Sequence, residues 1–222
     1  MKKNIIKIIL LITLIFSSDV FSQAKSGFQI VRLKYSGGGD WYNDPSAEIN
    51  LLKFIEKETT VKVNPEYKFV DVSSDDIFNY PFLFITGHGN IVLSENEVLR
   101  LRIYLERGGF IYIDDDYGMD KAIRREFKKV LPNQSFVELP FSHKIYHSFY
   151  NFEFGPPKTH EHNSKPPQGF GLFVGDRLAV YYTYESNPSD GWVDKEVHNN
   201  PEAKRLEALK FGTNLVIYSL TN

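Results

Sequence analysis

Residues 82–118 read FLFITGHGNIVLSENEVLRLRIYLERGGFIYIDDDYG. Two apolar runs of strand length, 82–86 and 110–113, flank a segment with helical spacing, so each run predicts a buried strand. Between them, Ser94 and Glu97 form an S-x-x-E capping box that marks the start of a helix, and a double glycine marks its end. This strand–helix–strand unit predicts two parallel strands joined by a right-handed crossover.

The same alternation extends to both sides of this unit. Residues 28–33 and 68–72 predict further strands, and a helix between them is predicted to have Asp44 as its N-cap and Pro45 at its first position. Another helix is predicted to end before Pro132, because proline cannot continue it. The expected fold class is therefore α/β, with an open, flavodoxin-like, mostly parallel sheet flanked by helices.

The second half of the chain is less regular. Residues 155–169 carry four prolines and two histidines and predict a long loop, which in a compact domain is typically functional or a lid. Residues 171–184 predict a β-hairpin around Gly175-Asp176. A closing helix is predicted to start at Asn200-Pro201.

The first 22 residues have the pattern of a secretory signal peptide. Three lysines precede the apolar run 8–16, which is too short to cross a bilayer because a membrane-spanning helix needs about 20 residues. We therefore expect one exported domain, 23–222, most simply in the periplasm, with no membrane span after removal of the signal. The chain has no cysteine, so a lipid-anchored cysteine, disulfides and thiolate chemistry are excluded.

The charge of the chain argues against a nucleic-acid partner. Removing residues 1–22 takes away three lysines and one aspartate, so the formal net charge moves from -2 to -4. A phosphate backbone would need a local basic patch, and the sequence offers none. We expect an unidentified protein or a small molecule as the partner.

Chemistry-bearing residues follow three of the predicted strands. The carboxyl ends of parallel strands meet at one edge of a sheet, so the loops after these strands should converge on one rim. The rim candidates are Gly38, Gly39, Asp40, Trp41, His88, Asp114, Asp115 and Asp116. His143 and His147 are added because they would share one face if their segment is helical, although the same spacing is equally common for a surface pair.

Three consecutive aspartates at the end of an apolar strand leave two interpretations open. In the first, one aspartate caps the following helix and another pairs with Arg124 or Arg125. In the second, the carboxylates hold a divalent cation; no specific motif such as H-E-x-x-H supports this reading. The candidate metal ligands are then His88, Asp115, Asp116, His160 and His162. No cofactor is required by the sequence.

Several runs together resemble the bacterial family of domain of unknown function 4159. These runs are 37–41, 80–89, 108–118, 124–126, 147–150 and 212–214. The resemblance covers nearly all of the predicted mature chain. It implies a fold of the class I glutamine amidotransferase-like superfamily, which agrees with the alternation of strands and helices.

Glutaminases of that fold place a nucleophilic cysteine on the turn after a central strand. The corresponding turn here holds Asp114–Asp116, so glutamine hydrolysis through a thioester is excluded. Two hypotheses follow, and whether the chain is an enzyme stays open between them. The chain is either a non-catalytic ligand- or protein-binding module, or a metal-assisted hydrolase that uses His88 and the three aspartates.

Overall fold

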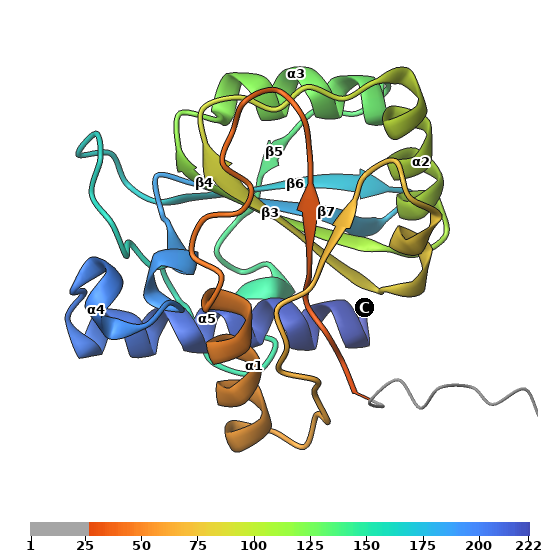
Figure 1. Ribbon diagram of the computed structural model, residues 1–222. Coiled ribbons are helices and arrows are strands. Elements are labelled where there is room, and N and C mark those ends of the chain that lie inside the picture. The colour runs from red at the N-terminus through yellow and green to blue at the C-terminus, as the bar shows by residue number, and fades with distance from the viewer. Residues whose placement is uncertain (1–26) are drawn as a thin grey trace, which may run out of the picture.

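The computed structural model describes residues 27–222, which form a sheet between two layers of helices (Figure 1). The strands are β1 (Val31–Lys34), β2 (Phe69–Asp71), β3 (Phe82–His88), β4 (Phe110–Tyr117), β5 (Val137–Glu138), β6 (Gln168–Val174) and β7 (Arg177–Tyr184). The α-helices are α1 (Ala47–Glu58), α2 (Glu95–Glu106), α3 (Asp120–Val130), α4 (Lys195–His198) and α5 (Glu202–Thr221). The 3₁₀ helices are η1 (Asp75–Asn79), η2 (Lys144–Tyr146) and η3 (Pro188–Gly191). The predicted signal peptide lies outside the described residues.

The sheet has seven strands in the order β2-β1-β3-β4-β7-β6-β5. The first five strands of that order run parallel, whereas β6 is antiparallel to β7 and β5 is antiparallel to β6. Numbered along the chain, the parallel strands lie 2-1-3-4-5, which is an order found in doubly wound sheets. The expectation of an α/β fold with an open, mostly parallel sheet flanked by helices is confirmed.

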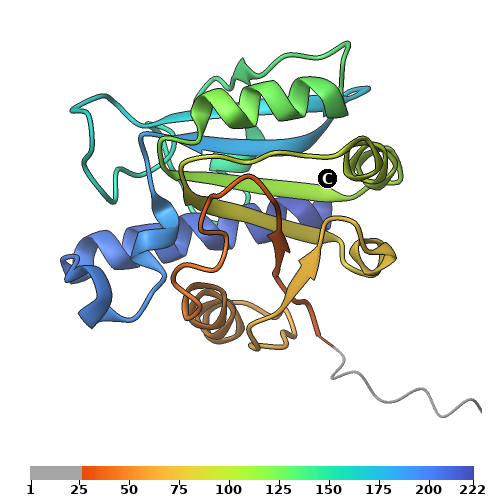
Figure 2. The ribbon, with the colours of Figure 1, turned by 45° about the horizontal axis from the view of Figure 1, so that its top comes forward.

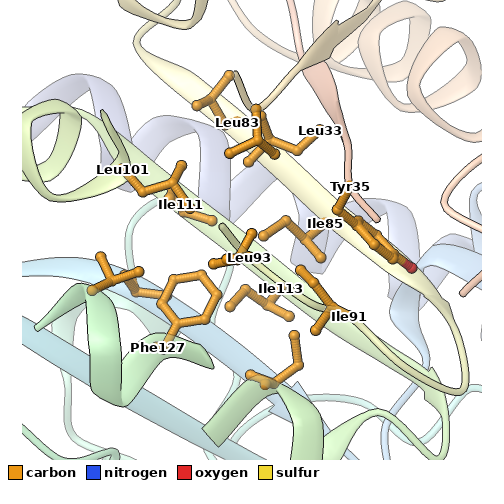
Figure 3. Packing of buried hydrophobic residues seen from close by; sticks show 14 of the residues in the cluster. Leu33, Tyr35, Leu83, Ile85, Ile91, Leu93, Leu101, Ile111, Ile113 and Phe127 are labelled. Atoms are coloured by element: carbon orange, nitrogen blue, oxygen red, sulfur yellow. The ribbon is translucent and has the colours of Figure 1, made fainter. Parts of the chain in front are cut away.

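Alternation along β4 gives the sheet two cores. Ile111 and Ile113 face α2 and α3, where they pack in one buried cluster with Phe127 (Figure 3). Phe110 and Tyr112 face the opposite side and join the cluster that contains the buried side chains of α1 and α5. The turned view shows the green helix α3 and the blue helix α5 on opposite sides of the sheet (Figure 2). Within the described residues, no helix has the length and apolar character needed to cross a membrane.

Two of the predicted helix starts can be compared directly with the structure. Both bonds of the capping box at Ser94 and Glu97 are present at the start of α2. The predicted start of α1 was wrong: the helix begins at Ala47, with Ser46 as N-cap and no side-chain capping bond. Asp44 instead has a φ of 47° and bonds His198 through its carboxylate, so that carboxylate is not available to cap the helix.

His143 and His147 were expected to share a face only if their segment is helical, and the structure forms no helix that includes both. The three-residue helix η2 lies between them, and the His143 ring accepts a hydrogen bond from the Ile145 N–H. His143 packs against Tyr218, which in turn packs on Phe110 at the start of β4. Both contacts are at the end of β4 opposite the three aspartates, so this segment is not part of the predicted rim.

Candidate functional site

Loops after β1, β3, β4 and β7 meet at the carboxyl ends of the parallel strands. From β1 the chain runs to β2 on one side, and from β3 it runs to β4 on the other side, so β1 and β3 flank the point where the strand order reverses. In open α/β sheets, ligands bind in the crevice outside this point. The candidate site therefore has the position that the topology favours.

The three aspartates at the end of β4 do not act as one cluster, because successive side chains of a strand point to opposite faces. Asp115 points toward α3 and accepts hydrogen bonds from the Met119 N–H (2.8 Å) and the Tyr182 hydroxyl (3.3 Å). Asp114 points to the other face, where it is fully buried and accepts from Thr183 and Ser189. The run thus divides between the two faces of the sheet.

Asp116 is the aspartate of the run that reaches the rim. Its carboxylate accepts hydrogen bonds from the side-chain amides of Asn43 (2.7 Å) and Asn187 (3.0 Å). His88 Nδ1 lies 3.3 Å from Asp116 Oδ2 and 3.0 Å from Asp40 Oδ2, while the His88 N–H donates to Asp40. The half-exposed imidazole of His88 is therefore held between two carboxylates.

A second group of side chains surrounds Asp190, the third residue of η3. His160 Nδ1 lies 2.8 Å from Asp190 Oδ2, and His198 Nε2 lies 3.6 Å from Asp190 Oδ1. The same nitrogen of His198 is 3.1 Å from Asp44 Oδ2. Two imidazoles from separate segments, the 155–169 loop and α4, thus converge on one buried carboxylate.

The two groups are joined through their carboxylates. Donor atoms of Asp44, Asp116 and Asp190 all lie within 4.8 Å of one another, and so do donor atoms of His160, Asp190 and His198. In the described part of the chain, these are the triples of histidine, aspartate or glutamate that are close enough to share an ion, and neither includes His88, Asp115 or His162. The predicted ligands are therefore not brought together at one point. Of them, His160 belongs to the histidine-containing triple and Asp116 to the aspartate triple.

Burial controls the protonation of these carboxyl groups. Desolvation raises the pKa of Asp114 and of Asp116 to about 7, and that of Asp190 to about 6. Burial lowers the pKa of His198, but Asp190 and Asp44 more than offset this and raise it overall. The pKa of His160 is lowered by burial and by the neighbouring His198, which favours its neutral, ligand-competent form.

An ion pair beneath the rim fixes the loop after β1. Arg32 in β1 donates to Glu48 in α1 at 2.6 and 2.8 Å, and both side chains are fully buried. The same guanidinium donates to the backbone carbonyls of Trp41, Asn43 and Asp44. This pair therefore connects a strand, a helix and the loop that carries two site carboxylates.

A pocket of about 510 Å³ opens beside Asp116. Its lining residues are Asp115, Asp116, Tyr117, Gly118, Asp120, Lys121, His162, Asn163, Tyr184, Glu185 and Asn187. Four of them are acidic and one is a lysine; of the four, Asp120 pairs with Arg124 and Glu185 pairs with Lys158. His162 contributes an imidazole whose ring lies 4.6 Å from that of Tyr117.

Buried Asn187 leaves one polar atom of this pocket without a partner. Its Nδ2 donates to the Asp116 carbonyl (2.6 Å) and approaches His162 Nε2 (3.0 Å), which fixes the orientation of the amide. Its Oδ1 is buried and has no hydrogen-bond partner. Such atoms are rare in native structures and call for an explanation, of which a bound donor is one.

The remaining predicted site residues lie around the site rather than in it. Arg124 pairs with Asp120 and Arg125 with Glu126, so neither arginine neutralises the aspartate run as the first interpretation required. That interpretation's cap is present, because Asp115 accepts from the residue just before α3.

The glycines and Trp41 of the β1 loop have structural surroundings. A Cβ on Gly39 would collide with the carbonyl oxygens of Asn90 and His88, so this close approach requires glycine, whereas Gly38 faces open space at a φ of 93°. Trp41 packs against Phe69, away from the pocket.

Five site residues were missed by the sequence analysis. They are Asn43, Asp44, Asn187, Asp190 and His198. The available signal was that 187–190 directly follow the apolar run 177–184, which forms the fifth parallel strand. We interpreted that run only as half of a hairpin with the preceding strand. It is also parallel to β4, so its carboxyl end reaches the rim.

One family model matches the chain, over residues 29–220, and its description is "Domain of unknown function (DUF4159)". The match spans the sheet, both helical layers and every residue of the candidate site. None of the curated proteins compared with the chain matches it.

Proposed function

The chain belongs to the DUF4159 family, and on that premise we propose that it is an exported, non-catalytic binding domain for a small cationic ligand. The ligand carries an ammonium or guanidinium group and binds in the pocket beside Asp116. The fold is proposed to be of the class I glutamine amidotransferase-like kind, with the rim reused for binding. Export rests on the signal-like residues 1–22, and we propose the periplasm as the destination.

The acidic lining of the pocket carries this proposal, because Asp115 and Asp116 have no lysine or arginine as ion-pair partner among the described residues. A cation with N–H groups can donate hydrogen bonds to carboxylates and offset their negative charge. Asp115, Asp116 and Glu185 line the same pocket and are each at most 4% exposed. A carboxylate ligand would be repelled by them.

The aromatic wall of the pocket fits the same class of ligand. Tyr117 is 49% exposed and Tyr184 is partly buried, so both present ring surface to the pocket. A cation over a tyrosine face gains about 0.5–2 kcal/mol, depending on how far it is desolvated.

The test compares three probes of different charge: Nα-acetyl-arginine methyl ester with its guanidinium, the neutral analogue Nα-acetyl-citrulline methyl ester, and the anion glutarate. Calorimetry and NMR should show binding of the guanidinium probe, weaker binding of the neutral one and none of the anion. Tyr117→Ala should lower the affinity for the guanidinium probe by about fivefold, the equivalent of about 1 kcal/mol. Lys121→Ala should raise this affinity, because the substitution removes a repelling charge from the pocket lining.

Tyr42→Ala is the matched control, since Tyr42 is 62% exposed and does not line the pocket. It should leave the affinity unchanged. Preferential binding of glutarate, or equal effects of the Tyr42 and Tyr117 variants, would refute the cationic-ligand proposal.

A metal-assisted hydrolase is the second candidate function. The observation that favours it is the position of the His88 imidazole between Asp40 and Asp116. An imidazole held by two carboxylates, with half of its side chain exposed, has the environment of a general base. Phosphoester, amide and glycoside substrates should then be turned over in the presence of Zn²⁺, and His88→Gln should abolish turnover. Turnover that persists in that variant would remove His88 from this role.

A further inference from the structure

We propose that His160, Asp190 and His198 bind one divalent transition-metal ion of the zinc class, with water in the fourth position. None of these three side chains lines the pocket of the proposed function, so the metal site is a separate inference. It is built by the 155–169 loop, η3 and α4.

The positions of the donor atoms are close to those that a tetrahedral ion needs. Metal–ligand bonds of about 2.0–2.2 Å place neighbouring donor atoms of a tetrahedral ion about 3.3–3.6 Å apart. His160 Nδ1 lies 2.8 Å from one oxygen of Asp190 and His198 Nε2 lies 3.6 Å from the other, and donor atoms of the three residues all lie within 4.8 Å of one another. An ion at their centre would replace these direct contacts with metal–ligand bonds.

The types of donor select the class of ion. Two imidazoles with carboxylates suit zinc and its first-row neighbours, whereas calcium and magnesium prefer all-oxygen sites. Three protein ligands leave the fourth position of a tetrahedral ion to an exchangeable water, as in zinc sites with an open position.

A second observation points to a cation at this place. Within residues 27–222, the ion-pair partners of Asp116 and Asp190 are imidazoles alone, with no lysine or arginine among them. Both carboxyl groups are at most 3% exposed. Buried carboxylates are normally paired with a full cation or coordinate a metal, and otherwise become protonated. A divalent ion would neutralise Asp190 directly and Asp116 through space.

The scaffold around these side chains holds them in position. The carbonyl of Asp190 accepts a hydrogen bond from Asn200 (3.1 Å), and the carbonyl of Thr159 accepts from Lys204 (3.3 Å). The His160 ring stacks on that of His162 with centres 4.6 Å apart. Such outer contacts orient metal ligands and typically change metal affinity by about 10–100-fold when removed.

The test is titration of the purified, chelator-treated chain with Co²⁺, followed by displacement with Zn²⁺. The expected result is one Co²⁺ per chain, a visible d–d spectrum of tetrahedral type and full displacement by Zn²⁺. His198→Gln should lower the affinity by at least about tenfold, and Asp190→Asn should do the same. A Zn²⁺-dependent rise in Tm should accompany binding in the parent chain and disappear in both variants.

His147→Gln is the matched control, because His147 bonds Asn151 and the Phe141 carbonyl and lies outside the cluster. It should bind Co²⁺ like the parent. If the buried Asp190 variant does not fold, the variant of the partly exposed His198 decides the question. Absence of stoichiometric Co²⁺ in the parent chain, or unchanged affinity in His198→Gln, would overturn the proposal. Loss of metal in His147→Gln to the same extent would also overturn it.

The two proposals fail separately. The arginine ester titration is run in chelator, so its outcome does not depend on the metal site. Conversely, Lys121→Ala should leave the Co²⁺ spectrum unchanged, because Lys121 lines the pocket and lies outside the metal triple.

Discussion

Replacing Glu48 with Gln tests whether the buried ion pair with Arg32 supports the rim. Both side chains are fully buried, and removing one charge of such a pair typically costs 3–5 kcal/mol. Arg32 keeps its bonds to three backbone carbonyls, so we expect the lower end, about 3 kcal/mol. For a chain of this size, that loss corresponds to a fall in Tm of about 6–12 °C.

The assay is urea unfolding followed by circular dichroism, with Asp75→Asn as the control. Asp75 pairs with Arg100 but its side chain is 82% exposed, so the same carboxylate-to-amide change should cost less than about 1 kcal/mol. A loss in Glu48→Gln no larger than that in Asp75→Asn would refute the reasoning. It would mean that the carbonyl bonds alone satisfy Arg32 and that the β1 loop does not depend on the ion pair.

Three further outcomes are expected from urea unfolding. Because burial raises the pKa of Asp114 from 3.8 to about 7, the folded state binds more protons, so the free energy of unfolding should fall between about pH 4 and about pH 7. Asp114→Asn should flatten this fall, and an unchanged slope would contradict the assignment. Phe127→Ala should cost about 3–5 kcal/mol because the ring is fully buried between α3 and the sheet, whereas half-exposed Leu99→Ala should change stability by under about 0.5 kcal/mol. Gly87→Ala should cost more than about 1 kcal/mol, since its φ of 139° disfavours a side chain and the added carbon would collide with the Tyr35 hydroxyl; a neutral result would show that this loop can move.

Local patterns were enough to predict much of the fold. The Ser94 and Glu97 capping box depends on residues three apart, and both of its bonds are present. The apolar runs 82–86 and 110–113 became the central parallel strands β3 and β4, because strands buried on both faces leave continuous apolar sequence. Predicting such features requires only residues that are close to one another in the sequence.

The site could be predicted only in part because it depends on pairings between distant segments. Asp40, His88 and Asp116 were identified from their positions after strands, and they do meet. No spacing indicated that His198 would reach Asp44, which is 154 residues away. The alternation along β4 was visible in the sequence, but its consequence for Asp115 requires knowing which face α3 covers.

The separation of the three aspartates in space has a physical cause. Because they are adjacent in sequence, we expected their side chains to form one cluster. A strand places adjacent side chains on opposite faces, so Asp115 serves the start of α3 while Asp114 and Asp116 serve the other face. Adjacency in a strand therefore predicts separation in space.

The contact between Asp44 and His198 also bears on the order in which the molecule assembles. One partner follows the first strand and the other precedes the last helix, so this contact closes a loop of most of the chain. Contacts of such long sequence separation carry a large closure entropy and slow folding. The rim therefore becomes complete only after both halves of the sheet have joined, and a nascent chain that ends before α4 would lack His198 and the buried side chains of α5 that cover one face of the sheet.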